Sequence, residues 1–134
     1  MIRMLYCSQA SPRISDDQIQ DILMVARRNN KAVGITGVLV HGGGMFMQVL
    51  EGPEDAVLRT YVKILDDPRH GASQVIQITP ANEQIFQGWS MGVIKSDPLE
   101  FQHIAELRAL RLETSNAKEC TDVMRAFANM LEKK

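Results

Sequence analysis

Apolar and polar residues alternate at the start of the chain in a way that predicts a strand over residues 2–7. Ile2, Met4 and Tyr6 share one face of this strand, and the other face is mostly apolar as well. A strand with two apolar faces is typical of the centre of a sheet that is covered on both sides.

Two longer stretches carry apolar residues at helical spacing. The first begins with the capping box Ser15-Asp16-Asp17-Gln18 and is predicted to end at Asn29-Asn30. The second begins after Pro53 with acidic residues in its first turn and ends before residues 66–71. Each helix presents one apolar stripe to a sheet, formed by Ile19, Ile22, Leu23 and Ala26 in the first and by Val57, Tyr61, Ile64 and Leu65 in the second.

Four further strands are predicted, over residues 33–41, 45–51, 73–78 and 88–94. Three glycines at 42–44 predict a tight hairpin turn. They do not form a phosphate loop, since the Gly-x-x-x-x-Gly-Lys pattern is missing and a strand follows. The last strand is expected to place Trp89, Met91 and Val93 on one face.

This order of elements predicts an α+β fold. Two strand-helix-strand units give a ferredoxin-like sandwich with a five-stranded mixed sheet and both helices on one face. Two amphipathic stretches follow, over residues 98–112 and 116–131. They are too short to be stable alone, so we expect a C-terminal two-helix extension that covers the other face, unless a partner subunit does so.

Composition narrows the classes of function. The 134 residues carry a formal net charge of −1 with mixed signs, which argues against a nucleic-acid partner. The sequence contains no apolar run of about 20 residues and no signal-peptide pattern, so we expect a cytoplasmic protein without a membrane partner. No metal site is expected, because ligand spacing is absent among Cys7, Cys120, His41, His70 and His103.

One polar residue stands out in the predicted core. Gln48 lies in an otherwise apolar strand, where an amide must find hydrogen-bond partners. Strand parity and topology bring Tyr6 and Gln48 to the floor of a groove between Ile22 and Ile64 of the two helices. Such a groove fits a flat heteroaromatic ligand, although a satisfied structural amide remains an alternative.

The ordered set of motifs resembles the BLUF family of blue-light sensors that use FAD. The resemblance covers roughly residues 1–95, with a C-terminal helical extension over 96–134 that contains no recognisable enzymatic domain. The motifs that carry it are Tyr6, Asn29-Asn30, Gly34-Ile35-Thr36-Gly37, Phe46-Met47-Gln48-Val49-Leu50-Glu51-Gly52, Asp67-Pro68-Arg69-His70 and Phe86-Gln87-Gly88-Trp89-Ser90-Met91.

The resemblance implies where FAD would bind. Ile22 and Ile64 would lie against the two faces of the flavin ring, and Gln48 would bridge Tyr6 and the flavin. Asn29 and Asn30 are implied as further contacts, with Asn30 at the pyrimidine edge. The implied contacts toward the ribityl and phosphate portion are Asp67, Arg69 and His70.

The resemblance also implies a function without an enzymatic activity. Blue light would draw an electron and a proton from Tyr6, and the Gln48 amide would rotate or tautomerise. Trp89 and Met91 would relay the switch to a change in protein association, within a homo-oligomer or with an unidentified downstream protein. Two other readings are an acylphosphatase-like hydrolase, for which residues 8–13 make a poor phosphate loop, and an interaction module without a ligand.

Overall fold

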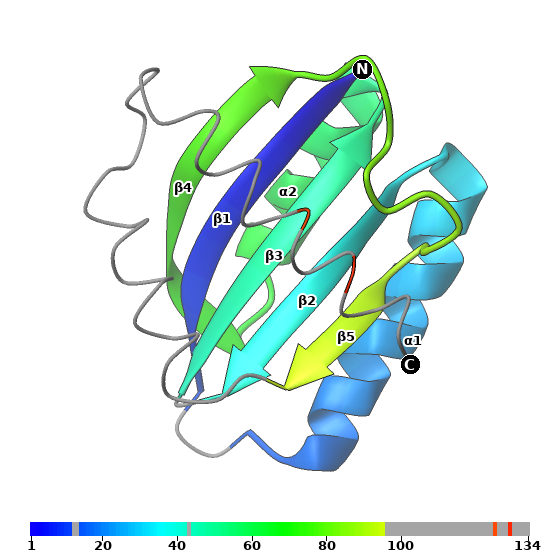
Figure 1. Cartoon of the computed structure of the whole chain (residues 1–134). Coiled ribbons are helices and arrows are strands. Elements are labelled where there is room, and N and C mark those ends of the chain that lie inside the picture. The colour runs from blue at the N-terminus through cyan, green and yellow to red at the C-terminus, as the bar shows by residue number, and fades with distance from the viewer. Residues whose placement is uncertain (12–13, 43, 96–124, 126–128, 130–134) are drawn as a thin grey trace.

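The computed structural model describes residues 1–11, 14–42, 44–95, 125 and 129. Two helices alternate with strands along the first 95 residues (Figure 1). The elements are β1 (Ile2–Ala10), α1 (Asp16–Val33), β2 (Thr36–Gly42), β3 (Met45–Gly52), α2 (Glu54–Leu65), β4 (His70–Pro80) and β5 (Gly92–Lys95).

The strands form one sheet in the order β4-β1-β3-β2-β5. The first four strands in this order pair antiparallel, whereas β5 lies parallel to β2 at the edge. This arrangement is the ferredoxin-like order with one added edge strand, and it confirms the predicted α+β class with two helices. The predicted C-terminal helices at 98–112 and 116–131 lie outside the described residues.

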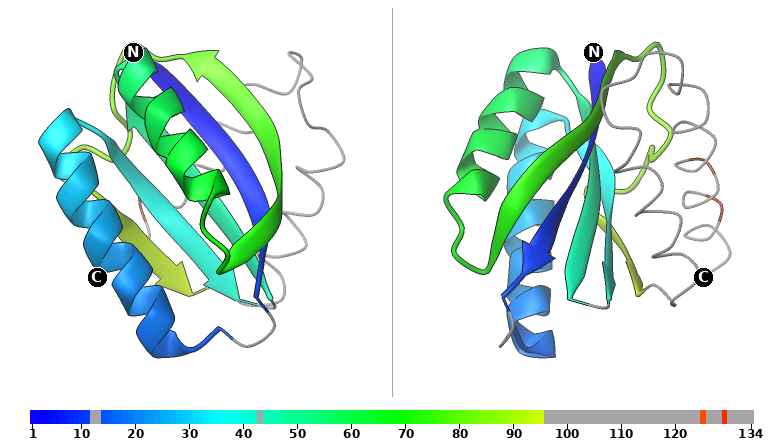
Figure 2. Two further views of the ribbon diagram at one scale, coloured as in Figure 1. Left: turned by 180° about the vertical axis from the view of Figure 1, so that it is seen from behind. Right: turned by 90° about the vertical axis from the view of Figure 1, so that its left-hand side faces the viewer.

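Both helices cover the same face of the sheet, as the rotated views show (Figure 2). Ile2, Met4 and Tyr6 point from β1 into this layer, where they join the core cluster with Leu23 of α1 and Val57 of α2. The predicted parity of β1 is therefore confirmed. The opposite face also has buried apolar side chains, namely Leu5, Cys7, Val38, Val40, Met47 and Val49.

Helix α1 starts as predicted but ends later. The Ser15 side chain accepts a hydrogen bond from the Gln18 N–H, and the Gln18 side chain accepts one from the Ser15 N–H, which completes the capping box. The predicted end at Asn29-Asn30 is wrong, because the helix continues to Val33. Gly34, with a φ of 77°, is the residue that adopts the left-handed conformation needed to end it.

The predicted boundaries of the last two strands also need correction. β4 begins at His70 rather than Ser73, and β5 begins only at Gly92 rather than Gly88. Trp89 and Met91 therefore lie in the segment that precedes β5. A turn with Gly88 at a φ of 88° interrupts the strand pattern there.

Gly37 shows why the central strands pack so closely. It pairs with Leu50 of β3, and any side chain at this position would collide with the main-chain carbonyl of Val49. Within the described residues, no helix is long and apolar enough to cross a membrane.

Candidate functional site

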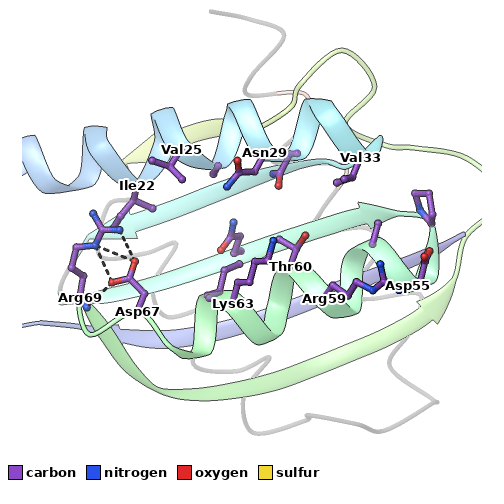
Figure 3. Close-up of a pocket in the computed structure, with 16 residues that line it drawn as sticks. Ile22, Val25, Asn29, Val33, Asp55, Arg59, Thr60, Lys63, Asp67 and Arg69 are labelled. Atoms are coloured by element: carbon purple, nitrogen blue, oxygen red, sulfur yellow. Dashed lines mark hydrogen bonds and ion pairs between the residues drawn. The ribbon is translucent and has the colours of Figure 1, made fainter.

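A cavity of about 560 Å³ lies between α1 and α2, above the centre of the sheet (Figure 3). This volume falls in the range of small-molecule pockets. Gln48 forms its floor, and Ile22 and Ile64 contribute to its walls from opposite helices. The remaining lining residues are Val25, Ala26, Asn29, Asn30, Val33, Pro53, Asp55, Ala56, Arg59, Thr60, Lys63, Asp67 and Arg69.

The side chain of Gln48 is held at both ends. Tyr6 and Gln48 lie directly opposite each other in the β1–β3 ladder, and the Tyr6 hydroxyl donates a hydrogen bond to Gln48 Oε1. Gln48 Nε2 donates to the thioether sulfur of Met91 over 3.6 Å. A thioether is a weak acceptor, so the Nε2 end of the amide is held less firmly than the Oε1 end.

Tyr6 is fully surrounded by protein. Only 1% of its surface is exposed, and its ring packs against Tyr61 of α2 with the centroids 4.8 Å apart and the planes at 58°. Burial raises the pKa of Tyr6 well above its ordinary value, and the neighbouring Tyr61 adds to the increase. The phenol is consequently a neutral hydrogen-bond donor over the physiological pH range.

Helix α1 anchors the segment that carries Met91. The buried Asn30 donates from Nδ2 to the main-chain oxygen of Ser90 over 2.8 Å. Arg27 donates from Nε to the main-chain oxygen of Met91 over 2.9 Å. Asn29 is exposed and lies at the rim of the cavity. The two adjacent asparagines thus have different environments.

A charged pair closes one end of the cavity. Arg69 donates from Nε and Nη2 to the carboxylate of Asp67, and the shortest of these bonds measures 2.6 Å. The Asp67 carboxylate raises the pKa of Arg69 further above its ordinary value. His70 begins β4 directly beside this pair, and its side chain lies outside the described part of the structure.

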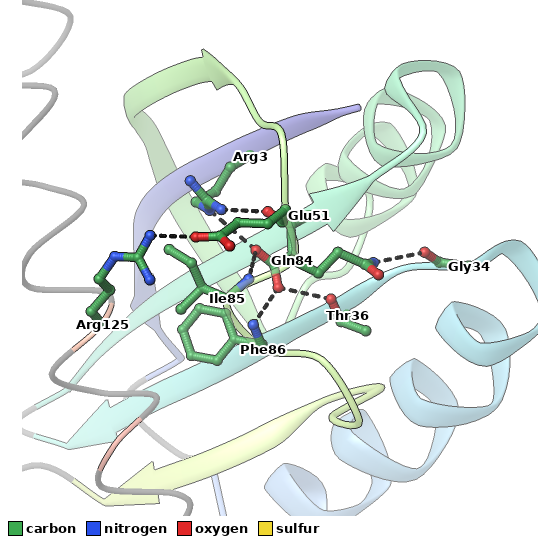
Figure 4. Close-up of polar contacts among 9 residues, drawn as sticks. Arg3, Gly34, Thr36, Glu51, Gln84, Ile85, Phe86 and Arg125 are labelled. Carbon is green, nitrogen blue, oxygen red and sulfur yellow. Dashed lines mark hydrogen bonds and ion pairs between the residues drawn. The ribbon is translucent and has the colours of Figure 1, made fainter.

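The buried carboxylate of Glu51 holds the other end of the segment before β5 (Figure 4). Glu51 is 0% exposed and pairs with Arg3 Nε at 3.1 Å. It accepts further hydrogen bonds from Thr36 Oγ1 at 2.9 Å and from the N–H groups of Ile85 at 2.9 Å and Phe86 at 2.5 Å. One side chain therefore ties β1, β2 and β3 to the segment that leads to Met91.

The structure brings most of the predicted site residues together. Ile22, Asn29, Asn30, Gln48, Ile64, Asp67 and Arg69 all line the cavity. Tyr6 and Met91 both contact the Gln48 side chain through hydrogen bonds. Trp89 is half-buried, and its main-chain oxygen accepts a bond from the Gly37 N–H.

Sequence reasoning missed a second stripe of α2, polar except for Ala56, that lines the cavity. Ala56, Arg59, Thr60 and Lys63 recur every three or four residues beside Ile64. The spacing could have revealed this stripe, but it borders the apolar stripe and looks like an ordinary solvated face. Arg59 and Lys63 add positive charge to the cavity wall, which suits an anionic ligand.

Comparisons with known proteins agree with this geometry. The family model described as sensors of blue light using FAD, BLUF, matches residues 1–92. The chain is 38% identical over 87 residues to the photoactivated adenylate cyclase subunit beta of Euglena gracilis, a match that covers 64% of this chain and 10% of that protein. It is 41% identical over 61 residues to the blue light- and temperature-regulated antirepressor BluF of Escherichia coli (strain K12), covering 42% of this chain and 15% of that one.

Solved structures show the same likeness. BlsA in its photo-activated state superposes with a TM-score of 0.77 at 30% identity, covering 92% of this chain and 94% of that chain. The dark-state structure of BlrB, a BLUF protein, gives a TM-score of 0.77 at 27% identity, covering 97% and 96% of the two chains.

The chain belongs to the BLUF family, and it senses blue light through FAD. The residues present fit this cofactor. Apolar walls suit a flat tricyclic ring, and the Gln48 amide offers both a donor and an acceptor. Arg59, Lys63 and Arg69 carry charge opposite to that of a diphosphate and outnumber the lining carboxylates Asp55 and Asp67. The chain spans about a tenth of the length of the cyclase subunit.

We expect Glu51→Gln to lower the free energy of unfolding by about 3–5 kcal/mol, because Arg3 would stay buried without a compensating charge. The new amide would also present its NH2 group to one of the N–H groups of Ile85 and Phe86, which bond different oxygens of Glu51. Urea unfolding measures the loss. The control is Glu83→Gln, since Glu83 pairs with Arg125 in an exposed position where ion pairs contribute little. Similar effects of the two substitutions would contradict this account.

We expect Tyr6→Phe to change the alkaline stability of the protein. The raised pKa means that the folded chain keeps the Tyr6 proton when the unfolded chain releases it. Above about pH 10 this group therefore lowers the free energy of unfolding by about 1.4 kcal/mol per pH unit. The variant should lose stability less steeply by that amount, as measured by denaturant titrations between about pH 9 and 12. Equal slopes in the two proteins would show that burial does not perturb Tyr6.

Proposed function

We propose that light acts on this protein through the Tyr6–Gln48 pair. The observation that carries the proposal is the buried hydrogen bond from the Tyr6 hydroxyl to Gln48 Oε1, directly below the cavity. FAD held in the cavity would supply a chromophore for blue light that, once excited, is an electron acceptor. Tyr6 is the oxidisable side chain bonded to Gln48 at the cavity floor, and this hydrogen bond gives the phenolic proton a path to the amide.

The residues of the cavity would hold the cofactor in distinct ways. Ile22 and Ile64 flank the flavin ring, because they line the cavity from opposite helices. Asn30 bonds the pyrimidine edge, with Asn29 at the rim. Asp67, Arg69 and His70 lie toward the ribityl and phosphate portion, where Asp67 and Arg69 form one charged end of the cavity.

Gln48 is the moving part in this proposal. Tyr6 would give up one electron to the excited flavin and one proton to Gln48 Oε1, while Gln48 Nε2 would release a proton toward the flavin. On return Tyr6 would regain one electron and one proton, which leaves the Gln48 amide rotated or in its imidic tautomer with no net gain or loss of atoms. Either change exchanges donor and acceptor positions at the cavity floor, where the low local dielectric strengthens hydrogen bonds. The altered hydrogen bonding shifts the flavin absorption to the red.

Met91 receives the change first. Its sulfur accepts from Gln48 Nε2 in the present arrangement, so a rearranged amide alters that contact. Met91 and Trp89 precede β5, and β5 leads into residues 96–134. We propose that this route biases how those residues associate with another copy or with a downstream protein.

We further propose a division of the chain into a flavin-binding domain over residues 1–95 and a helical extension over 96–134. In this proposal the extension forms two helices, which pack on the face of the five-stranded mixed sheet opposite α1 and α2. The chain carries no enzymatic activity of its own and acts in the cytoplasm, without a nucleic-acid or membrane partner.

We expect a reversible red shift of the flavin spectrum under blue light in the wild-type protein and in Tyr61→Phe. The shift should be lost in Tyr6→Phe, which lacks the transferable proton, and in Gln48→Leu, which lacks the amide. A light-minus-dark absorption spectrum measures all four proteins. A normal photocycle in either Tyr6→Phe or Gln48→Leu would refute the mechanism.

Truncation near Asp97 should leave flavin binding and the red shift largely intact, because the cavity is built from residues 22–69. The truncated chain should lose the light-dependent change in association. Absorption spectra and size-exclusion chromatography in the dark and under light test both parts. Loss of flavin on truncation would show instead that the extension is part of the flavin-binding fold.

A further inference from the structure

Ser8 carries a buried hydroxyl that the mechanism above does not use. The residue is 1% exposed, and its Oγ is a buried side-chain oxygen without a hydrogen-bond partner among the described residues. Leaving such a group unsatisfied is costly, so native proteins rarely do so. An orphan hydroxyl in a core indicates a partner that the protein atoms alone do not supply.

The position of Ser8 points to that partner. Ser8 follows Tyr6 by two residues in β1, so both side chains project from the same face of the sheet. It lies opposite Phe46, two residues before Gln48 in β3. A second, small cavity of about 20 Å³ opens at this point, and it is lined by Ser8, Ile22, Leu39, Phe46 and Gln48.

The size and lining of this small cavity fit one water molecule. A buried water needs a probe-sized space of at least about 10–15 Å³ and two or more polar partners. Ile22, Leu39 and Phe46 offer no side-chain polar group, so the side-chain partners are the Ser8 hydroxyl and the Gln48 amide. Gln48 retains capacity for both roles, because each amide hydrogen and each carbonyl lone pair can serve a separate bond.

We propose that one water molecule is bound between Ser8 Oγ and the Gln48 amide, and that Ser8 is a positioning residue of the switch. The water satisfies the hydroxyl and contacts Gln48 from the small cavity. Both the hydroxyl and the water can donate or accept a hydrogen bond. They therefore give the rearranged amide a partner whichever way it faces, which the Met91 sulfur cannot do.

The claim that a water is bound here does not depend on the proposed function. The claim that Ser8 acts on the Gln48 switch rests on the proposed function. The first arm of the test is a high-resolution crystal structure of the flavin-bound protein in the dark. We expect a water within hydrogen-bond distance of Ser8 Oγ and the Gln48 side chain, and its loss in Ser8→Ala. An empty cavity in the wild-type structure would overturn the proposal, even if the photocycle is normal.

The second arm measures the rate of dark recovery after blue light. Ser8→Ala should recover about two- to tenfold faster, as expected for the loss of one hydrogen bond that stabilises the light state. Ser8→Cys keeps the size but donates weakly, so it should be intermediate, and it replaces Ser8→Ala if that variant fails to fold. Recovery of both variants at the wild-type rate would overturn the positioning role.

Ser11→Ala is the matched control. Ser11 is a serine of the same segment, and its hydrogen bonds to Arg69 and Ile14 are made by the main chain. We expect it to recover at the wild-type rate, whereas acceleration equal to that in Ser8→Ala would overturn the assignment to Ser8. If the wild-type protein shows no red shift at all, the proposed function fails, and the crystallographic arm still decides whether Ser8 and Gln48 hold the water.

Discussion

The register of β1 against β3 is the constraint on which the site depends. It sets Tyr6 opposite Gln48 on the face covered by helices and Arg3 opposite Glu51 on the other face. Because side chains alternate along a strand, a slip of one residue would turn Tyr6 or Gln48 away from the cavity. The same slip would separate the buried ion pair of Arg3 and Glu51. The Arg3–Glu51 ion pair on one face of the sheet therefore stabilises the register that places Tyr6 opposite Gln48 on the other face.

The segment between β4 and β5 is fixed in its middle and at its C-terminal end, and that end lies next to the switch. Glu51 holds the N–H groups of Ile85 and Phe86, whereas Asn30 and Arg27 of α1 hold the main chain at residues 90 and 91. The Met91 side chain then meets Gln48 through a weak sulfur contact. The hydrogen bonds to the main chain thus fix the position of the segment, whereas the Met91 sulfur forms only a weak hydrogen bond with the Gln48 amide. This combination allows a small local change without loss of the surrounding structure.

Sequence patterns predicted the parts of the fold that short-range chemistry controls. The capping box at Ser15 and the parity of β1 placed α1 and Tyr6 correctly, and topology placed Gln48 on the shared face. The end of α1 was missed because Asn29-Asn30 disfavours a helix only weakly, while Gly34 ends it through a backbone conformation. The start of β5 depends on a turn at Gly88 and on tertiary contacts. Ser8 could not be assigned at all, since an unpaired hydroxyl becomes visible only once its neighbours are packed.

The burial of Tyr6 has a consequence for the quality of the signal. A light sensor should not change state without light. If the hydrogen-bond donor beside the chromophore titrated near cellular pH, a change in intracellular pH would also alter the site. Enclosed by the sheet and by Tyr61, the Tyr6 phenol is 1% exposed, and its raised pKa moves ionisation further from cellular pH than in an exposed tyrosine. Changes in cellular acidity should therefore add little background at this residue, which reserves the switch for light.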